Sequence, residues 1–287
     1  MIMMGSPIWL AALLAFLVAF IVWSAGRARK VLRIPFRSEG GLFSNLLLRN
    51  MEYAVCYPQH RLECAGWPED VRALLPNMPR ETGAESEPLP SVYIGSPCYF
   101  GQDAKLLVSA SFADVRRRLH PTVAPGGPFA PAEHVRALAR AWWEREIGHR
   151  FVVGVHGRAA LHYEGDLDLA THVRLLADEA AEEARPGGVV LLASCNRTIV
   201  EYMRGRFGAS LAWREPEGEI NTGNVDWGGA VQVLTREIAM GALVDALLLS
   251  MCDVVVCGSS NVIVYAAALR PAMRIRVARH LSDRRGR

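Results

Sequence analysis

Short apolar runs alternate with helix-length segments through the second half of the chain, and this alternation limits the fold more than any other feature. Strands are expected at residues 151–156, 189–193, 210–213 and 253–257. Helices are expected at residues 169–184, 197–207, 231–251 and 262–269. Strands that are apolar at successive positions are typical of parallel sheets covered on both faces, and alternating strands and helices indicate βαβ units. We therefore predict an α/β fold with a Rossmann-like parallel sheet.

The composition is that of a globular protein and argues against two classes of partner. The chain has 287 residues, of which 51% are hydrophobic and 21% charged, enough for two modest domains or one large one. The net charge is +3 and the basic residues are scattered, so we expect no nucleic-acid partner. The six cysteines include no Cys-x-x-Cys pair and no Cys/His ligand spacing, so we expect no bound metal.

The cysteines divide into two groups by their neighbours. Cys195, Cys252 and Cys257 lie in apolar runs and are expected to be small buried hydrophobic residues. Cys56 and Cys64, together with Cys98, could form disulfides if the compartment is oxidising.

An uncharged stretch at residues 7–25 is about long enough to cross a bilayer as a helix. A cleaved signal peptide is the rival reading, but the first six residues have no basic side chain. We predict a single-pass membrane protein, with an anchor and its basic flank over residues 1–35. The positive charges follow the span, which favours a cytoplasmic location for the rest of the chain, and the side of the membrane stays open.

Residues 36–148 are predicted to form a first lobe and residues 149–287 a second. A Gly-rich loop at 37–44 leads into a helix expected over 45–55, and this loop is either a linker turn or an anion contact. Further along, a surface loop is expected at 76–90, a short strand at 92–94, a Pro- and Gly-rich break at 121–131 and a helix at 132–146.

Polar residues follow three of the predicted strands, and in a parallel sheet these strand ends share one edge. The three segments are His156-Gly157-Arg158, Ser194-Cys195-Asn196 and Gly258-Ser259-Ser260-Asn261. Two of them open helices, whose amino-terminal N–H groups and positive dipole ends attract phosphate, and a guanidinium adds a cation. Ser260 and Asn196 are equally what simple helix caps look like. The three segments together predict a site for a phosphate-bearing ligand.

Two further residues are open to more than one reading. Asp245 lies in a helix that is apolar on nearly all sides, so its carboxylate needs a partner: Arg236, a backbone group, or donors on a ligand base or ribose. His156 is either a packed strand-end residue or a ligand contact. The chain has no Gly-x-Gly-x-x-Gly, Gly-x-x-x-x-Gly-Lys or Gly-x-Ser-x-Gly sequence, which removes the usual signatures of dinucleotide enzymes, P-loop enzymes and α/β-hydrolases.

The sequence Val-Gly-Val-His-x-Arg at 153–158, followed by DALLLSMCDVVVCGSSN at 245–261, resembles the GDP-fucose-dependent glycosyltransferases of the α-1,6- and protein O-fucosyltransferase superfamily. The resemblance covers residues 151–271 and is weak over the first lobe. It implies two Rossmann-like lobes of the GT-B type, with the nucleotide sugar bound mainly by the second. It also implies inversion at the anomeric carbon and transfer without a metal.

The resemblance also assigns roles to particular residues. It makes Arg158 the cation that neutralises the β-phosphate as the leaving group departs, and it places His156 and Asp245 against the guanosine. Ser259 or Ser260 would hold phosphate oxygens. The remaining residues of this predicted nucleotide-sugar site are Gly157, Asn196 and Asn261.

The chain departs from the family at the position expected to carry acid–base chemistry. The family often follows its arginine with a second Arg or a Gly and then Thr-Asp, whereas Ala159, Ala160 and Leu161 follow Arg158 here. An acidic base in this loop would match Asp166 or Glu164, and Asp166 is equally a cap for the next helix. Where the family commonly shows Thr-Asp after its next strand, this chain has Ser194-Cys195-Asn196.

These features predict a membrane-anchored inverting fucosyltransferase that moves fucose from GDP-fucose to a glycan or protein hydroxyl, with no further cofactor. If the source is eukaryotic, a Golgi or other secretory-pathway membrane is the expected location. Two alternatives stay open: a degenerate relative that binds nucleotide or glycan without turnover, and a phosphate-binding Rossmann enzyme unrelated to sugars.

Overall fold

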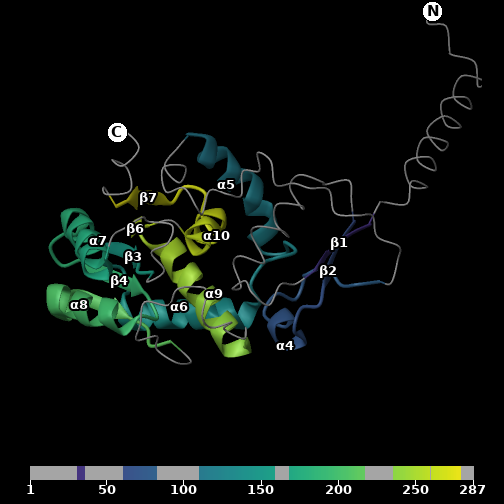
Figure 1. Cartoon of the computed structure of the whole chain (residues 1–287), viewed down its shortest axis with the longest axis horizontal. Coiled ribbons are helices and arrows are strands. Elements are labelled where there is room, and N and C mark those ends of the chain that lie inside the picture. The colour runs from purple at the N-terminus through teal and green to yellow at the C-terminus, as the bar shows by residue number, and fades with distance from the viewer. Residues whose placement is uncertain are drawn as a thin grey trace, which may run out of the picture.

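The second half of the chain forms a five-stranded parallel sheet, in a computed structural model that describes residues 31–35, 61–82, 110–158, 168–216, 235–258 and 260–278 (Figure 1). The strands lie in the order β5-β4-β3-β6-β7, and all four neighbouring pairs are parallel. Their bounds are β3 Val152–His156, β4 Val189–Ala193, β5 Leu211–Trp213, β6 Val254–Cys257 and β7 Arg274–Val277. The predicted α/β fold with a Rossmann-like parallel sheet is confirmed.

The strand order reverses beside β3. The chain builds from β3 outward through β4 to β5, then returns to pair β6 on the other side of β3 and adds β7 outside it. His156, the last residue of β3, is in register with Ala193 of β4 and Cys257 of β6. The carboxyl ends of β3 and β6 therefore form a topological switch point, where open α/β sheets bind their ligands.

Helices cover both faces of this sheet. One face carries α7 (Leu169–Glu183) and α8 (Arg197–Phe207), and the other carries α6 (Glu133–Glu146), α9 (Arg236–Met251) and α10 (Asn261–Leu269). Alternate residues of β3 serve the two cores: Val153 and Val155 pack with α7 and α8, whereas Val152 packs in the other cluster. Successive side chains of a strand point to opposite faces of the sheet, and here both faces are covered. Every position of the strand is therefore apolar, which explains the unbroken apolar runs in the sequence.

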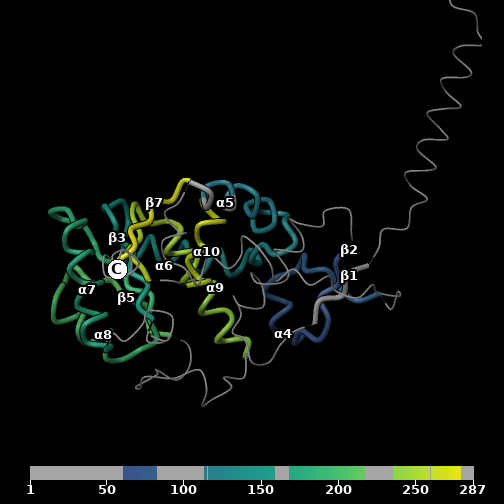
Figure 2. The backbone as a smooth tube through the Cα atoms, turned by 45° about the horizontal axis from the view of Figure 1, so that its top comes forward, coloured from purple at the N-terminus to yellow at the C-terminus, as the bar shows by residue number. Residues whose placement is uncertain are grey.

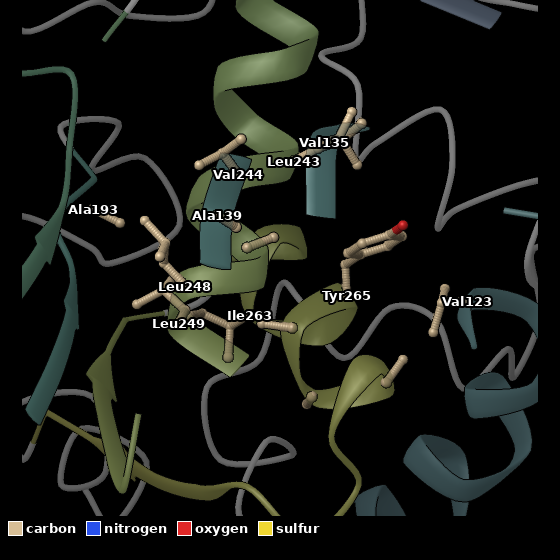
Figure 3. Packing of buried hydrophobic residues seen from close by; sticks show 14 of the residues in the cluster. Val123, Val135, Ala139, Ala193, Leu243, Val244, Leu248, Leu249, Ile263 and Tyr265 are labelled. Carbon is tan, nitrogen blue, oxygen red and sulfur yellow. The ribbon is translucent and has the colours of Figure 1, made fainter. Parts of the chain in front are cut away.

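Helix α9 lies at the centre of the larger core, which is why its sequence is apolar on nearly all sides. Leu243, Leu248 and Leu249 are at most 1% exposed. Figure 3 shows Leu248 and Leu249 of α9 close to Ile263 of α10, and Ala139 of α6 belongs to the same cluster. A buried hydroxyl in the same cluster is satisfied, because Tyr265 donates to the carbonyl of Phe129 over 2.8 Å.

The described part of the first half packs onto the same core. It contains a two-stranded parallel sheet, β1 (Val31–Pro35) and β2 (Arg61–Ala65), and helices α4 (Glu69–Arg72) and α5 (Ala110–Val123). Figures 1 and 2 both place β2 and α4 at the opposite end of the molecule from α7 and α8, and Figure 1 shows β1 beside β2. Two polar contacts join α5 to the second half: Arg116 donates to the carbonyl of Met273 over 2.7 Å, and His120 Nδ1 lies 2.8 Å from that of Ala268.

Several predicted boundaries change. Helix α9 begins at Arg236 rather than 231, because the hydroxyl of Thr235 accepts the N–H of Ile238 and caps the helix there. Helix α5 continues through Pro121 to Val123, so the break begins later than predicted. The sequence analysis missed β1, β2 and β7, and it started β5 one residue early because Ser210 ends a 3-10 turn.

Some predictions concern residues outside the described ranges. These are the membrane span at 7–25, the Gly-rich loop and helix at 37–55 and the strand at 92–94. Among the residues that the structure describes, no helix is both long and apolar enough to cross a bilayer. The division into lobes at residues 36–148 and 149–287 stays a prediction, and the larger core draws residues from both sides of that boundary.

Gly154 marks the closest approach of β3 to the end of α9, and it predicts a measurable stability effect. A Cβ at this position would lie 2.7 Å from Cys252 Sγ and 3.1 Å from Leu249 Cδ2. Gly154→Ala should lower the free energy of unfolding by about 1–3 kcal/mol through overpacking, as measured by urea titration. Gly205→Ala is the matched control, because a Cβ there meets nothing within 4 Å and α8 should gain about 0.5–1 kcal/mol. Equal stability of the two variants would contradict this account of the contact.

Candidate functional site

The segment after β3 is pressed against the junction of β4 and α8. The N–H of Gly157 donates to the carbonyl of Ala193 over 3.0 Å, which continues the ladder for one residue beyond the strand. A Cβ on Gly157 would lie 2.8 Å from Ile199 Cγ2 and 3.3 Å from Ser194 Oγ. Only a glycine fits this approach without displacing α8. Gly157 therefore lets His156 and Arg158 leave the sheet at its carboxyl edge.

His156 is held in its neutral form. Its Nδ1 is buried and has no hydrogen-bond partner within the described ranges. Burial lowers the pKa of His156 to about 3, and the positive charge of Arg158 and the nearby His172 act in the same direction. Near neutral pH the imidazole thus offers one donor and one acceptor but no charge. Arg158, two residues after His156, adds a guanidinium at the end of β3.

The helix starts at this edge use their side chains as caps. Asn196 Oδ1 accepts the N–H of Ile199 over 3.1 Å at the start of α8, and Ser260 Oγ accepts that of Val262 over 3.2 Å at the start of α10. The capping interpretation of Asn196 and Ser260 is confirmed. Each cap satisfies one first-turn N–H group, and the positive dipole end of each helix lies at this edge.

Asp245 has a partner that the sequence analysis did not identify. Arg214, directly after β5, donates to Asp245 Oδ1 from Nε over 3.2 Å and from Nη2 over 2.9 Å. Nη2 also donates to the carbonyl of Gly241 over 3.0 Å. The predicted partners, Arg236 or a backbone group, are wrong, because Arg214 comes from the neighbouring strand end. Burial raises the pKa of Asp245, and Arg214 opposes that rise.

Arg214 could have been found from the sequence by one signal. It follows a predicted strand directly, as Arg158 nearly does, so the topology brings it to the same edge as the three polar segments. That strand is only three residues long, and each of them is part-buried rather than buried. Because the apolar pattern of this strand is weak, Arg214 was not recognised as a strand-end cation.

The cysteine predictions are partly wrong. Cys252 and Cys257 are fully buried as expected, but Cys195 is exposed at the edge, since it belongs to the loop after β4 rather than to the strand. Desolvation by the groups around its sulfur raises the pKa of the Cys195 thiol, and the negative charge of Asp245 adds to this effect. Cys64, predicted as a possible disulfide partner, is a buried free thiol.

The structure brings most of the predicted site residues to one edge. His156, Gly157 and Arg158 end β3, Asn196 follows β4, and Ser260 and Asn261 follow β6. Through Arg214, Asp245 of α9 joins them. Asp166, Glu164 and Ser259 lie outside the described residues.

The cap of α7 is Asp168, whose Oδ1 accepts the N–H of Thr171 over 2.8 Å. No cluster of three or more His, Cys, Asp or Glu side chains suited to a metal ion occurs in the described part of the chain.

Comparison with known proteins gives one kind of match. No protein-family model and no curated protein matches the sequence. Among solved structures, the chain is similar to the NodZ α-1,6-fucosyltransferase soaked with GDP-fucose, with a TM-score of 0.47 and 16% identity over 84% of this chain and 92% of that one. The same enzyme co-crystallised with GDP gives a TM-score of 0.46 and 17% identity over the same shares.

The matched structures are of an α-1,6-fucosyltransferase, the kind of enzyme that the motifs in residues 151–271 resemble.

The neutral state of His156 predicts how stability depends on pH. The unfolded chain binds a proton on this imidazole near its ordinary pKa of 6.5, whereas the folded chain binds it only near 3. Stability contributed by His156 is therefore present above pH 6.5 and lost as the pH falls toward 3, by at most about 1.4 kcal/mol per pH unit.

Urea titrations between pH 6.5 and 4.5 test this for wild type and His156→Gln. The variant should lose less stability per pH unit than wild type. The His149→Gln variant, at an exposed position, controls for the loss of a histidine as such. Parallel pH profiles for wild type and His156→Gln would show that His156 is not held neutral by the fold.

Proposed function

We propose that this protein is a glycosyltransferase that uses a GDP-sugar, and that its reaction is the inverting transfer of fucose from GDP-fucose to a glycan or protein hydroxyl. The observation that carries the proposal is the placement of Arg158 at the switch point of the sheet, beside the neutral His156. Diphosphates bind at such switch points in other α/β sheets. The choice of fucose as the sugar and guanine as the nucleobase comes from the resemblance of residues 153–158 and 245–261 to the fucosyltransferase superfamily.

The edge has the groups that such a reaction needs on the donor side. As the bond between the anomeric carbon and the β-phosphate oxygen breaks, negative charge grows on the phosphate. The Arg158 guanidinium and the first-turn N–H groups of α10 would stabilise that charge as it develops, with Ser259 or Ser260 holding phosphate oxygens. His156 and Asp245 would contact the guanosine, which is recognised by hydrogen-bond donors and acceptors, whereas the positive charge of Arg158 serves the phosphate.

The acceptor side is assigned more coarsely. The acceptor hydroxyl attacks the anomeric carbon from the face opposite the leaving group, and a carboxylate takes its proton. We assign that base to Asp166, in the loop after Arg158. The leaving group is stabilised by protein groups in this scheme, so transfer is proposed to proceed without a metal.

The apolar stretch at 7–25 would tether the enzyme to a membrane, with a Golgi or other secretory-pathway membrane as the location in a eukaryote.

A binding protein without turnover is the second candidate. It is favoured by the sequence after Arg158, where alanines replace the polar residues that the family often has. Such a protein would keep the donor-side cation and lack the groups that activate an acceptor. The two candidates share the nucleotide site and differ in product formation.

The first experiment is nucleotide binding by calorimetry. Full-length protein should be used, because β1 (Val31–Pro35) precedes the predicted first lobe at 36–148, and a fragment cut at that boundary would lack it. Wild type should bind GDP more tightly than UDP or ADP. Arg158→Ala should weaken GDP binding by about 10- to 100-fold, the loss of charge-assisted hydrogen bonds to phosphate, and Arg158→Lys should weaken it less.

Arg174→Ala is the matched control, since Arg174 is exposed on α7 and does not belong to the predicted site. Equal weakening by both arginine variants would reduce Arg158 to a contributor to overall charge. Absence of GDP binding in folded wild type would refute the transferase proposal, and binding without guanine preference would favour a Rossmann enzyme unrelated to sugars. Fucose release or transfer from GDP-fucose, followed by product analysis, separates the enzyme from the degenerate relative.

A further inference from the structure

The ion pair between Arg214 and Asp245 is asymmetric in a way that suggests a role beyond packing. Both contacts from the guanidinium, at 3.2 and 2.9 Å, fall on Oδ1 of Asp245. Within the described ranges Oδ2 has no hydrogen-bond partner, and 26% of the Asp245 side chain remains exposed. One carboxylate oxygen is therefore clamped while the other stays available at the ligand edge.

The clamp itself is built into the helix that carries Asp245. Arg214 is only 13% exposed, and its Nη2 also donates to the carbonyl of Gly241, one helical turn before Asp245. A Cβ at Gly241 would lie 3.2 Å from that nitrogen, so the absence of a side chain makes room for the guanidinium. The arginine is thus fixed at two points along α9, which leaves Asp245 little freedom to rotate.

An ionised oxygen in a fixed position suits one chemical difference between purine bases. Guanine presents an exocyclic 2-amino group beside its ring N–H, whereas hypoxanthine has the same ring N–H and the same carbonyl without the amine. A fixed, negatively charged acceptor forms a hydrogen bond with that extra donor. Bound hypoxanthine would cover the same acceptor and leave it unpaired, which costs affinity.

We infer that Arg214 is a positioning residue that sets guanine selectivity: it holds Oδ1 of Asp245 so that Oδ2 accepts a hydrogen bond from the 2-amino group of a guanine nucleotide. This inference rests on the proposed use of a GDP-sugar and adds a residue that the family resemblance does not assign. Arg214 acts through Asp245 and does not itself touch the base.

The test compares GDP with IDP, its hypoxanthine counterpart, by calorimetry on the full-length protein. Wild type should prefer GDP over IDP by about tenfold or more, the discrimination expected for a hydrogen bond to a charged group. In Arg214→Met most of this preference should disappear through weaker GDP binding, while the affinity for IDP stays near the wild-type value. IDP is the internal control, because a merely misfolded variant would lose both ligands.

Two further variants keep the test decisive if Arg214→Met is unstable. Arg214→Lys restores a cation with one contact point and should recover part of the GDP preference. Gly241→Ala leaves every charge in place but moves the guanidinium, and it should reduce the preference as well.

Two outcomes would refute the positioning role of Arg214, and a third would refute the proposed function. An unchanged ratio of GDP to IDP affinity in folded Arg214 and Gly241 variants would refute the positioning role and leave the donor proposal standing. A higher affinity for GDP in Arg214→Met would mean that Arg214 competes with the base for Asp245, which also refutes it. Failure of wild type to bind GDP at all would refute the proposed function itself.

Discussion

Burial of β3 on both faces is the constraint on which the rest of the structure depends. The strand pairs with β4 on one side and β6 on the other, and its alternate side chains enter two separate cores. A strand enclosed in this way has no solvent-exposed edge and no exposed face, so its register and direction are fixed by every neighbour at once. The consequence appears at its end, where the chain must leave the sheet at the place where the strand order reverses.

The exit from β3 brings two opposite electrostatic demands together. A phosphate needs a cation near it, and a base needs hydrogen-bonding groups that do not attract the phosphate instead. In the proposed function, Arg158 and His156 meet these demands from positions two residues apart, because burial and the arginine charge both keep the imidazole neutral. Gly157 between them makes the arrangement possible by allowing the chain to pass Ile199 of α8.

The sequence predicted those parts of the fold that depend on strong local patterns. Strands β3, β4 and β6 and helices α7, α8 and α10 were placed within a residue or so, because their apolar periodicity and their caps agree. Strand β7 was missed because alternating arginines, Arg274 and Arg276, interrupt its apolar pattern. Those arginines pair with acidic residues of α7, a contact that depends on tertiary structure. The partner of Asp245 was missed for the same reason: Arg214 is 31 residues away in sequence, and only the sheet order brings them together.

The Arg214–Asp245 pair also shows why a partly buried ion pair is more informative about function than about stability. Removing two charges from water costs free energy that their attraction offsets only in part, so an apolar pair of similar volume would often stabilise the fold as well or better. Helix α9 is otherwise an apolar element in an apolar core, where such a replacement would be easy to accommodate. The pair instead lies at the edge of the sheet on which the chain gathers its other polar residues, and one oxygen of Asp245 remains uncommitted within the described structure. A carboxylate paired and oriented in this way costs stability at that position, and the proposed hydrogen bond to a guanine base would offset that cost.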